Sequence, residues 1–166
     1  MELEIIKHKN ILFRDILRAI AIKTVAWPHP LESQVKWIVD NMHNEDLHVF
    51  LKEEDKDVAY STLSPVLGIL NGNPKSFLGL GCVCSVKRGV GYGRVLVMQV
   101  NEYLMSNNAI GLLFCKDAIT DFYEKYDWIV IPEDRVMLAE TTPKAIKVML
   151  YNCNMPEKLI YSGKMF

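Results

Sequence analysis

The sequence has no excess of charge of either sign and no long uninterrupted hydrophobic run. Nineteen lysines and arginines stand against twenty aspartates and glutamates, so the formal net charge at neutral pH is −1. Such a chain exerts no overall attraction on nucleic acid or on an anionic membrane, and neither is an expected partner. No apolar stretch approaches the roughly 20 residues that span a bilayer, and the N-terminal MELE is acidic where a secretory signal would be basic. We therefore expect a cytoplasmic protein.

The sequence also lacks the paired C-x-x-C spacing of a zinc site. Its four cysteines stand at positions 82, 84, 115 and 153, and the first two lie within an apolar segment. This placement is typical of small buried side chains in a reducing compartment, and we expect no metal. A length of 166 residues with 50% hydrophobic composition fits one compact domain, residues 1–166.

The stretch around which the chain is organised is Phe77–Met98, which reads FLGLGCVCSVKRGVGYGRVLVM. An apolar run ends at Ser85, three alternating glycines follow at positions 89, 91 and 93, and an amphipathic pattern begins after them. This order predicts a strand, a glycine loop and a helix. Glycines adopt positive φ and leave their N–H groups uncovered, while the helix adds unpaired amides and the positive end of its dipole. The pattern therefore predicts an anion-binding loop.

Two common phosphate-binding motifs are absent from this loop. The dinucleotide fingerprint G-x-G-x-x-G requires a third glycine at position 94 or 96, where the chain has Arg94 and Leu96. The loop of nucleoside triphosphatases requires Gly-Lys-Ser/Thr, which is also missing. A nucleotide-dependent oxidoreductase is one alternative reading of this loop. The chain, however, lacks the third glycine and a ribose-binding acid at the proper distance from the loop.

The hexapeptide Arg88-Gly-Val-Gly-Tyr-Gly93 resembles the R-x-x-G-x-G signature of the GNAT superfamily of N-acetyltransferases, in which this loop holds the pyrophosphate of acetyl-coenzyme A. A second stretch, Phe114–Trp128, reads FCKDAITDFYEKYDW. It resembles the D-A-x-x-x-F-Y landmark of serotonin N-acetyltransferase-like and aminoglycoside-acetyltransferase-like members. Both occur in the family's order, and with the elements between them they cover about the middle third of the chain.

The resemblance implies a mixed α/β sheet with the GNAT acyl-CoA N-acyltransferase fold: an antiparallel meander followed by a parallel, splayed strand pair with a crossover helix. The patterns agree with it. They predict strands at 3–6, 47–51, 58–69, 77–85 and 109–115, a closing hairpin of 128–131 with 136–140, and helices at 10–27 and 30–42. In the first helix Asn10 is the expected N-cap, and Phe13, Ile16, Leu17 and Ile20 are the expected core face. The tail after Thr141 stays ambiguous, with Ile146–Leu150 short and apolar and Leu159–Phe166 a candidate edge strand.

The resemblance also assigns candidate roles along the chain. Tyr123 matches the position that donates a proton to the sulfur of coenzyme A, and a backbone N–H near Val83 would stabilise the oxyanion. The residues expected to bind the cofactor, acetyl-coenzyme A, are Gly81, Cys82, Val83, Arg88, Gly89, Val90, Gly91, Tyr92, Gly93 and Arg94. The acceptor-side candidates are Trp27, His29, Glu45, Asp46, His48, Tyr60 and Asp117.

The chain departs from the family's pattern at the positions that carry the general base. Serotonin N-acetyltransferase-like members carry histidines in the strand before the loop, where this chain has Phe77 and Gly79. Asp46, His48, Tyr60 and Asp117 are the polar groups that could take the role, unless the amine arrives already neutral.

We therefore predict an N-acetyltransferase that moves the acetyl group of acetyl-coenzyme A to a primary amine, most simply a small molecule, by direct attack in a ternary complex. The alternative is a non-catalytic GNAT-fold module that binds coenzyme A as a sensor or regulatory partner. The retained Tyr123 favours the enzyme, and the missing histidines favour the module. The sequence leaves open the identity of the amine and the oligomeric state, a homodimer included.

Overall fold

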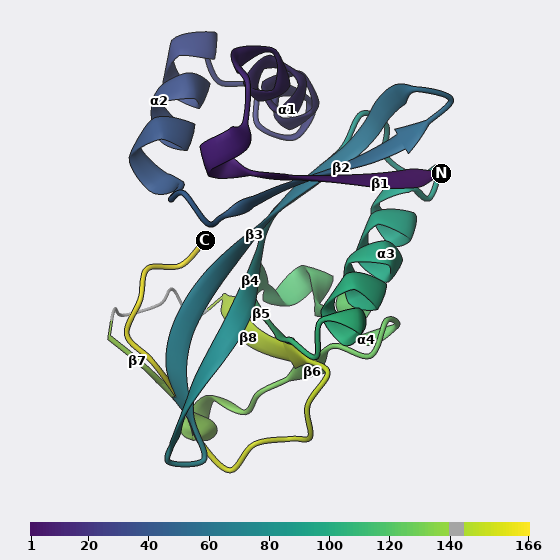
Figure 1. The fold of residues 1–166 in the computed structure, drawn as a ribbon. Helices are drawn as coiled ribbons and strands as arrows, with labels where there is room; N and C mark the ends of the chain where they lie inside the picture. The colour runs from purple at the N-terminus through teal and green to yellow at the C-terminus, as the bar shows by residue number, and fades with distance from the viewer. Residues whose placement is uncertain (140–144) are drawn as a thin grey trace. The chain divides into compact units, whose positions relative to one another are not determined.

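The computed structural model describes residues 1–139 and 145–166, coloured along the chain in Figure 1. The chain forms two compact units, the first made of Met1–Ser64 and Gly81–Gln99 and the second of Pro65–Leu80 and Val100–Phe166. The strands β3 (Lys56–Leu70) and β4 (Asn73–Ser85) and the helix α3 (Tyr92–Ser106) contribute residues to both units. That all 166 residues act as one domain stays a prediction.

The first unit is built on an antiparallel meander, as predicted. Its strands β1 (Glu2–Lys7), β2 (Leu47–Glu53), β3 and β4 follow one another in the order of the sequence. In this register Ile6 lies opposite His48, and His48 opposite Thr62. Every residue from Leu47 to Leu51 is buried, so both faces of β2 are covered.

Two helices, α1 (Phe13–Ala26) and α2 (Leu31–Asn41), cover one face of the first unit's sheet (Figure 1). The prolines at 28 and 30 separate them as predicted, and Pro30 is the N-cap of α2. The predicted N-cap of α1, Asn10, is wrong. It lies in a short 3-10 helix, His8–Asn10, and Leu12 precedes α1 with its backbone N–H donated to the Asp15 carboxylate at 3.2 Å.

The predicted core face of α1 is partly wrong. Ile20 is buried against Ile38 of α2 and against Met42, which follows that helix, but Phe13 is 64% exposed and Leu17 38%. The residues that face the sheet are instead Ala19 and Ile22, which pack with Phe50, Tyr60 and Cys84. Phe13 lies with Leu31, Val35 and Val39 along an open apolar groove of about 500 Å³ between the two helices.

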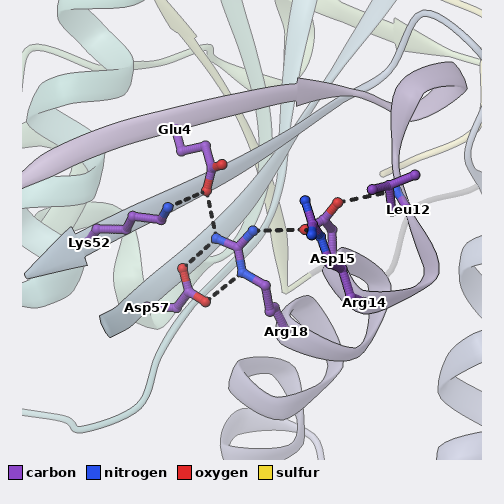
Figure 2. Close-up of polar contacts among 7 residues, drawn as sticks. All are labelled: Glu4, Leu12, Arg14, Asp15, Arg18, Lys52 and Asp57. Atoms are coloured by element: carbon purple, nitrogen blue, oxygen red, sulfur yellow. Dashed lines mark hydrogen bonds and ion pairs between the residues drawn. The ribbon is translucent and has the colours of Figure 1, made fainter. Parts of the chain in front are cut away.

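An ion-pair cluster connects α1 to the strands of the first unit (Figure 2). The Arg18 guanidinium donates two hydrogen bonds to Asp57, each 2.7 Å long, and one each to Asp15 and Glu4. Glu4 also pairs with Lys52 at 2.8 Å. One arginine of α1 is thereby linked to β1, to the start of β3 and to the first turn of its own helix.

The second unit contains the parallel strand pair that the sequence predicted. Phe77–Leu80 of β4 lie beside Ile110–Leu113 of β5 (Ile110–Lys116), and α3 makes the connection. On the other side of β5 lies β8 (Ile146–Tyr151), antiparallel to it. The apolar segment of the tail is therefore a strand between β5 and β6 (Ile129–Val130). The splay of β4 and β5 stays a prediction.

The predicted closing hairpin is wrong. Strand β6 pairs with β8, whereas β7 (Val136–Leu138) runs parallel to β9 (Leu159–Tyr161), and a 3-10 turn at Glu133–Arg135 separates the two. Strand β9 also pairs with Ile69–Leu70 of β3, so the last predicted strand exists in shortened form. Residues 140–144, which include the predicted end of the hairpin and Pro143, lie outside the described part of the chain.

The second unit has an apolar core, made by Phe77, Leu112, Ile131, Leu150 and Leu159. The short helix α4 (Thr120–Glu124), which lies within the second sequence landmark, follows β5 through a 3-10 turn. Across residues 1–139 and 145–166, every helix is too short or too polar to span a membrane.

Candidate functional site

The glycine loop lies in the first unit, between the end of β4 at Ser85 and the start of α3 at Tyr92. Gly89 and Gly91 have φ values of +79° and +92°, as the sequence predicted, whereas Gly93 lies within the helix and is not among the positive-φ glycines. The Val95 N–H donates to the Gly91 carbonyl at 3.1 Å, which is the first bond of the helix. Helix geometry therefore leaves the amides of residues 92–94 without an intrahelical acceptor, at the positive end of the dipole.

The space around the loop is open, and its side chains are basic. A Cβ added at Gly89 would meet no atom within 4 Å, so the space beside this residue is open. Arg88 and Arg94 are both exposed, and the Arg94 guanidinium lies 3.9 Å from the position of a Cβ on Gly91. Helix-terminal amides beside exposed arginines are the arrangement predicted for an anion-binding loop, and its binding role stays a prediction.

The tyrosine within the loop points elsewhere. The Tyr92 hydroxyl donates to the Glu53 carboxylate at 2.7 Å, and this bond raises the pKa of the phenol. Tyr92 thus connects the loop to the end of β2, and only its backbone amide belongs to the candidate anion site. Val90, the other apolar loop residue, is 46% exposed.

Strand β4 is distorted before the loop, where the sequence predicted cofactor contacts at Gly81, Cys82 and Val83. Cys82 has a φ of +53°, which a residue with a side chain rarely adopts within a strand and which is typical of a bulge. A bulge redirects the backbone N–H groups of its neighbours, which is consistent with an amide donor near Val83. That Val83 contributes this donor stays a prediction. Burial raises the pKa of the thiols at 82 and 84, to about 12 for Cys84, so neither is a thiolate at neutral pH.

Two acceptor-side candidates, His48 and Tyr60, lie together on the sheet face that α1 covers. His48 Nδ1 lies 2.8 Å from the Tyr60 hydroxyl, and His48 Nε2 lies 2.9 Å from Nδ1 of His8. His48 has no exposed surface and Tyr60 is 1% exposed. Burial lowers the pKa of His48 to about 4, with help from the nearby His8 and Lys23, so its ring is neutral at pH 7.

Sequence reasoning missed two members of this cluster, His8 and Lys23. His8 follows the last residue of β1, and only the strand register brings it beside His48. Lys23 reads as a solvated helix residue, yet it is 5% exposed, with its ammonium 3.8 Å from the centre of the Trp37 ring. Burial lowers the pKa of Lys23, whereas the thiols of Cys82 and Cys84 act to raise it. The signal for Lys23 was its spacing of four residues from Ala19, on the face that packs on the sheet.

The other acceptor-side candidates lie in different surroundings. Glu45 is exposed and pairs with Lys7 and Lys9, which lowers its pKa to about 2. Asp46 is buried and accepts the His43 backbone N–H at 2.8 Å, so it closes a turn. Trp27 and His29 are both exposed at the bend between α1 and α2, and Asp117 is exposed at the start of a 3-10 turn in the second unit.

Tyr123 lies in α4 of the second unit and is 4% exposed. Its ring makes edge contacts with Phe122 and Trp128, with centroids 5.0 and 6.2 Å apart. Burial raises the pKa of its phenol, so the hydroxyl is protonated at every physiological pH. Its role as a proton donor stays a prediction.

The second unit also explains why β4 carries no base at Phe77 and Gly79. Phe77 belongs to the apolar core at 2% exposure. A Cβ on Gly79 would overlap the ring of Phe166, which packs against Phe114. A larger side chain at 79 therefore requires Phe166 to move.

No family model matches the sequence, and no curated protein matches it either. Solved structures do match. An acyl-CoA N-acyltransferase from Pseudomonas aeruginosa is 11% identical, with 91% of this chain and 99% of that chain covered and a TM-score of 0.64. A putative N-acetyltransferase from Lactobacillus plantarum is 18% identical over 91% and 98% of the two chains, with a TM-score of 0.59.

A third structure, the PaiA N-acetyltransferase from Thermoplasma acidophilum in complex with coenzyme A, is 16% identical over 91% of this chain and 99% of that one, with a TM-score of 0.52. Identities this low show the fold alone. Together with the meander and the parallel β4–β5 pair, these matches show that the chain has the GNAT acyl-CoA N-acyltransferase fold.

Proposed function

We propose that this protein is an N-acetyltransferase that transfers the acetyl group of acetyl-coenzyme A to the primary amine of a small molecule. The observation that carries the proposal is the loop before α3. Two positive-φ glycines and two exposed arginines lie at the start of a helix whose first amides have no intrahelical acceptor, in the fold of acyl-CoA N-acyltransferases. A pyrophosphate is a doubly charged ligand that such a site accommodates without a metal ion.

In the proposed reaction the neutral amine attacks the thioester carbonyl within a ternary complex. A backbone amide near Val83, beside the bulge at Cys82, stabilises the oxyanion, and the protonated thiols at 82 and 84 make an acyl-enzyme on either cysteine unfavourable. The departing thiolate takes a proton from Tyr123. Burial makes this phenol a weaker acid than in water, so its proton moves only as negative charge develops on the sulfur.

A second function is favoured by the same burial of Tyr123 and by the missing histidines in β4. In that account the protein binds coenzyme A and catalyses nothing, acting as a sensor or a regulatory partner. The two functions differ in turnover and share the binding loop.

The test is release of free thiol when the protein is mixed with acetyl-coenzyme A and each of five amines: tyramine, spermidine, glucosamine, lysine and an alanyl peptide. Mass spectrometry of the amine then checks for an added acetyl group. We expect thiol and acetylated amine in equal amounts with at least one member of the panel. Saturable coenzyme A binding without thiol release across the panel would instead support the module.

A further inference from the structure

The glycine loop has few buried side chains that could hold its backbone in place. Residues 86–90, between β4 and α3, are all exposed, and Gly89 and Gly91 have positive φ. Glycine loses more conformational freedom on ordering than any other residue. An anion held by backbone amides binds more tightly when those amides are oriented before the ligand arrives. The contacts that fix this loop therefore bear on its affinity.

Two hydrogen bonds connect the loop to the hairpin of β2 and β3, one at each end of the loop. At the entry, the backbone N–H of Val86 donates to the Val58 carbonyl of β3 at 3.0 Å. At the exit, the Tyr92 hydroxyl donates to the carboxylate of Glu53, the last residue of β2, at 2.7 Å. Tyr92 is the first residue of α3, so this bond acts on the turn whose amides have no intrahelical acceptor.

The bond between Tyr92 and Glu53 has an ionised acceptor. Hydrogen bonds to a carboxylate are shorter and roughly twice as strong as bonds between neutral groups. The phenol responds as expected, because this hydrogen bond is the main cause that raises the pKa of Tyr92. The hydroxyl therefore remains a donor at neutral pH.

The acceptor is itself held in place by the end of the hairpin. Glu53 lies opposite Lys56 across its tip, and Lys52 lies opposite Asp57 one pair further in. Asp57 accepts two hydrogen bonds from Arg18 of α1, and Lys52 pairs with a carboxylate of β1 (Figure 2). The Glu53 carboxylate thus offers the loop a fixed point of attachment to the first unit.

The charge of Glu53 by itself works against an anion in the loop. A carboxylate repels the phosphates that the loop is proposed to hold. If charge were its only effect, removal of Glu53 would strengthen coenzyme A binding. If its bond with Tyr92 orients the loop, removal would weaken binding. The two explanations therefore predict effects of opposite sign.

We propose that Glu53, acting through Tyr92, is a positioning residue that holds the amides at the start of α3 ready for an anionic ligand. The inference rests on the proposed binding of coenzyme A and adds to that site a residue 39 positions earlier in the chain. The bond fixes the first turn of α3, and the backbone amides of that turn contact the pyrophosphate. Loss of either partner leaves the amides present but no longer held in one orientation.

The test measures coenzyme A and pantetheine affinity by calorimetry on the full chain and on its Tyr92→Phe and Glu53→Ala variants. We expect each variant to bind coenzyme A about tenfold more weakly, the order of one lost charge-assisted hydrogen bond. Pantetheine, which has no phosphate, should stay within about twofold. The double variant should lose no more than either single one, because the two side chains share one bond. Glu53→Gln keeps an oxygen acceptor and should restore binding to within about threefold of the wild type.

Glu54→Ala is the matched control, because it removes an exposed carboxylate from the tip of the same hairpin. It should not weaken coenzyme A binding. Tighter binding in Glu53→Ala would overturn the proposal, since the carboxylate would then act only by repulsion. Unchanged affinity in Tyr92→Phe, or equal losses for coenzyme A and pantetheine, would also overturn it.

A wild type that binds no coenzyme A would overturn the proposed function and this inference together. A wild type that binds coenzyme A as tightly as both variants would overturn the inference alone. If Tyr92→Phe fails to fold, the sign of the effect in Glu53→Ala decides the question.

Discussion

At the scale of single residues, burial determines what the candidate groups can do. Tyr123 and Tyr60 are each at most 4% exposed, and burial raises the pKa of both phenols. Neither phenol is ionised at physiological pH. Cys82 and Cys84 are protonated for the same reason. The protonated thiols of the first unit therefore disfavour covalent catalysis by a thiolate.

We predict that Tyr123→Phe lowers kcat by about 10²- to 10⁴-fold, the usual contribution of general acid catalysis. Coenzyme A affinity and the melting temperature stay nearly unchanged, because the ring keeps its contacts with Phe122 and Trp128. Thermal melting and kcat are measured on one preparation. A stable variant that keeps more than about a tenth of the turnover would argue against proton donation and leave water as the acid.

Arg88 allows a comparison of two ligands. Its exposed guanidinium precedes the loop, where it can reach a phosphate, so Arg88→Ala should weaken coenzyme A more than it weakens pantetheine, which has no phosphate. Calorimetry with both ligands measures the difference, and Lys75→Ala, in an exposed part of β4, is the control. Equal losses for both ligands would give Arg88 a structural role.

The sequence predicted the glycine loop more completely than the cluster of polar side chains around His48 and Tyr60. The positive φ of Gly89 and Gly91 follows from local chemistry, because only glycine adopts it without strain. His8 and Lys23 could not be found this way, since their burial depends on strand register and on the rotation of α1. Glu45 was a candidate through the family resemblance, and its pairing with two lysines is a contact between distant positions.

At the scale of elements, the Arg18 cluster determines how α1 is attached to the first unit's sheet (Figure 2). Its guanidinium also lies over the Phe50 ring, 4.3 Å from the ring centre. Burial alone would raise the pKa of Glu4, but hydrogen bonds from Lys52 and Arg18 outweigh it and lower that pKa. The cluster is therefore a source of stability that depends on ionised carboxylates.

We predict that Arg18→Met lowers the free energy of unfolding by about 2 kcal/mol. This is less than the 3–5 kcal/mol of a broken buried ion pair, because the members of the cluster are partly exposed. Urea unfolding measures it, and Lys36→Met, which breaks an exposed pair with Asp40, should change stability by less than about 0.5 kcal/mol. Equal effects of the two substitutions would contradict the assignment.

The same variant has a predicted pH dependence. A carboxylate whose pKa is lowered in the folded state stabilises the fold above its unfolded pKa, and this contribution is lost as the pH falls through the folded value. For Glu4 this stabilisation is lost in a pH range below the ordinary pKa of the carboxyl, 4.5. The stability difference between wild type and Arg18→Met should therefore shrink as the pH falls from about 5 to 3. A constant difference would mean that packing on Phe50, and not charge, accounts for it.

The errors in the predicted elements have one physical cause: contacts with parts of the chain that are distant in sequence. The apolar stripe of α1 was correctly helical, but a helix that contacts both a sheet and another helix buries two narrow faces, which leaves Phe13 and Leu17 outside. The segments at 128–131 and 136–140 were predicted to pair because they are close in sequence. Strand β6 pairs instead with β8, which the ambiguous tail supplies. Local patterns predict the type of an element, and partners distant in sequence decide its pairing.

At the scale of the whole molecule, the fold and the loop make a thermodynamic prediction. A ligand that binds only the folded state at 100 times its dissociation constant adds about 2.7 kcal/mol of stability. For a chain of 166 residues this corresponds to a rise in Tm of about 5–10 °C with coenzyme A. NAD is the control and should give no shift, because the loop lacks the third glycine of a dinucleotide fingerprint. A shift with NAD alone would support the oxidoreductase alternative.

The central claim, that the loop before α3 binds the pyrophosphate of coenzyme A, is tested most directly by calorimetry on Gly91→Val. Gly91 has a φ of +92°, which valine does not adopt without strain, and its side chain would stand beside Arg94 at the open face of the amides. Val86→Ala, at an exposed site before the loop, is the control. We predict that the wild type and the control bind coenzyme A with equal affinity and that folded Gly91→Val shows no binding. Unchanged affinity in folded Gly91→Val would contradict the assignment of the loop.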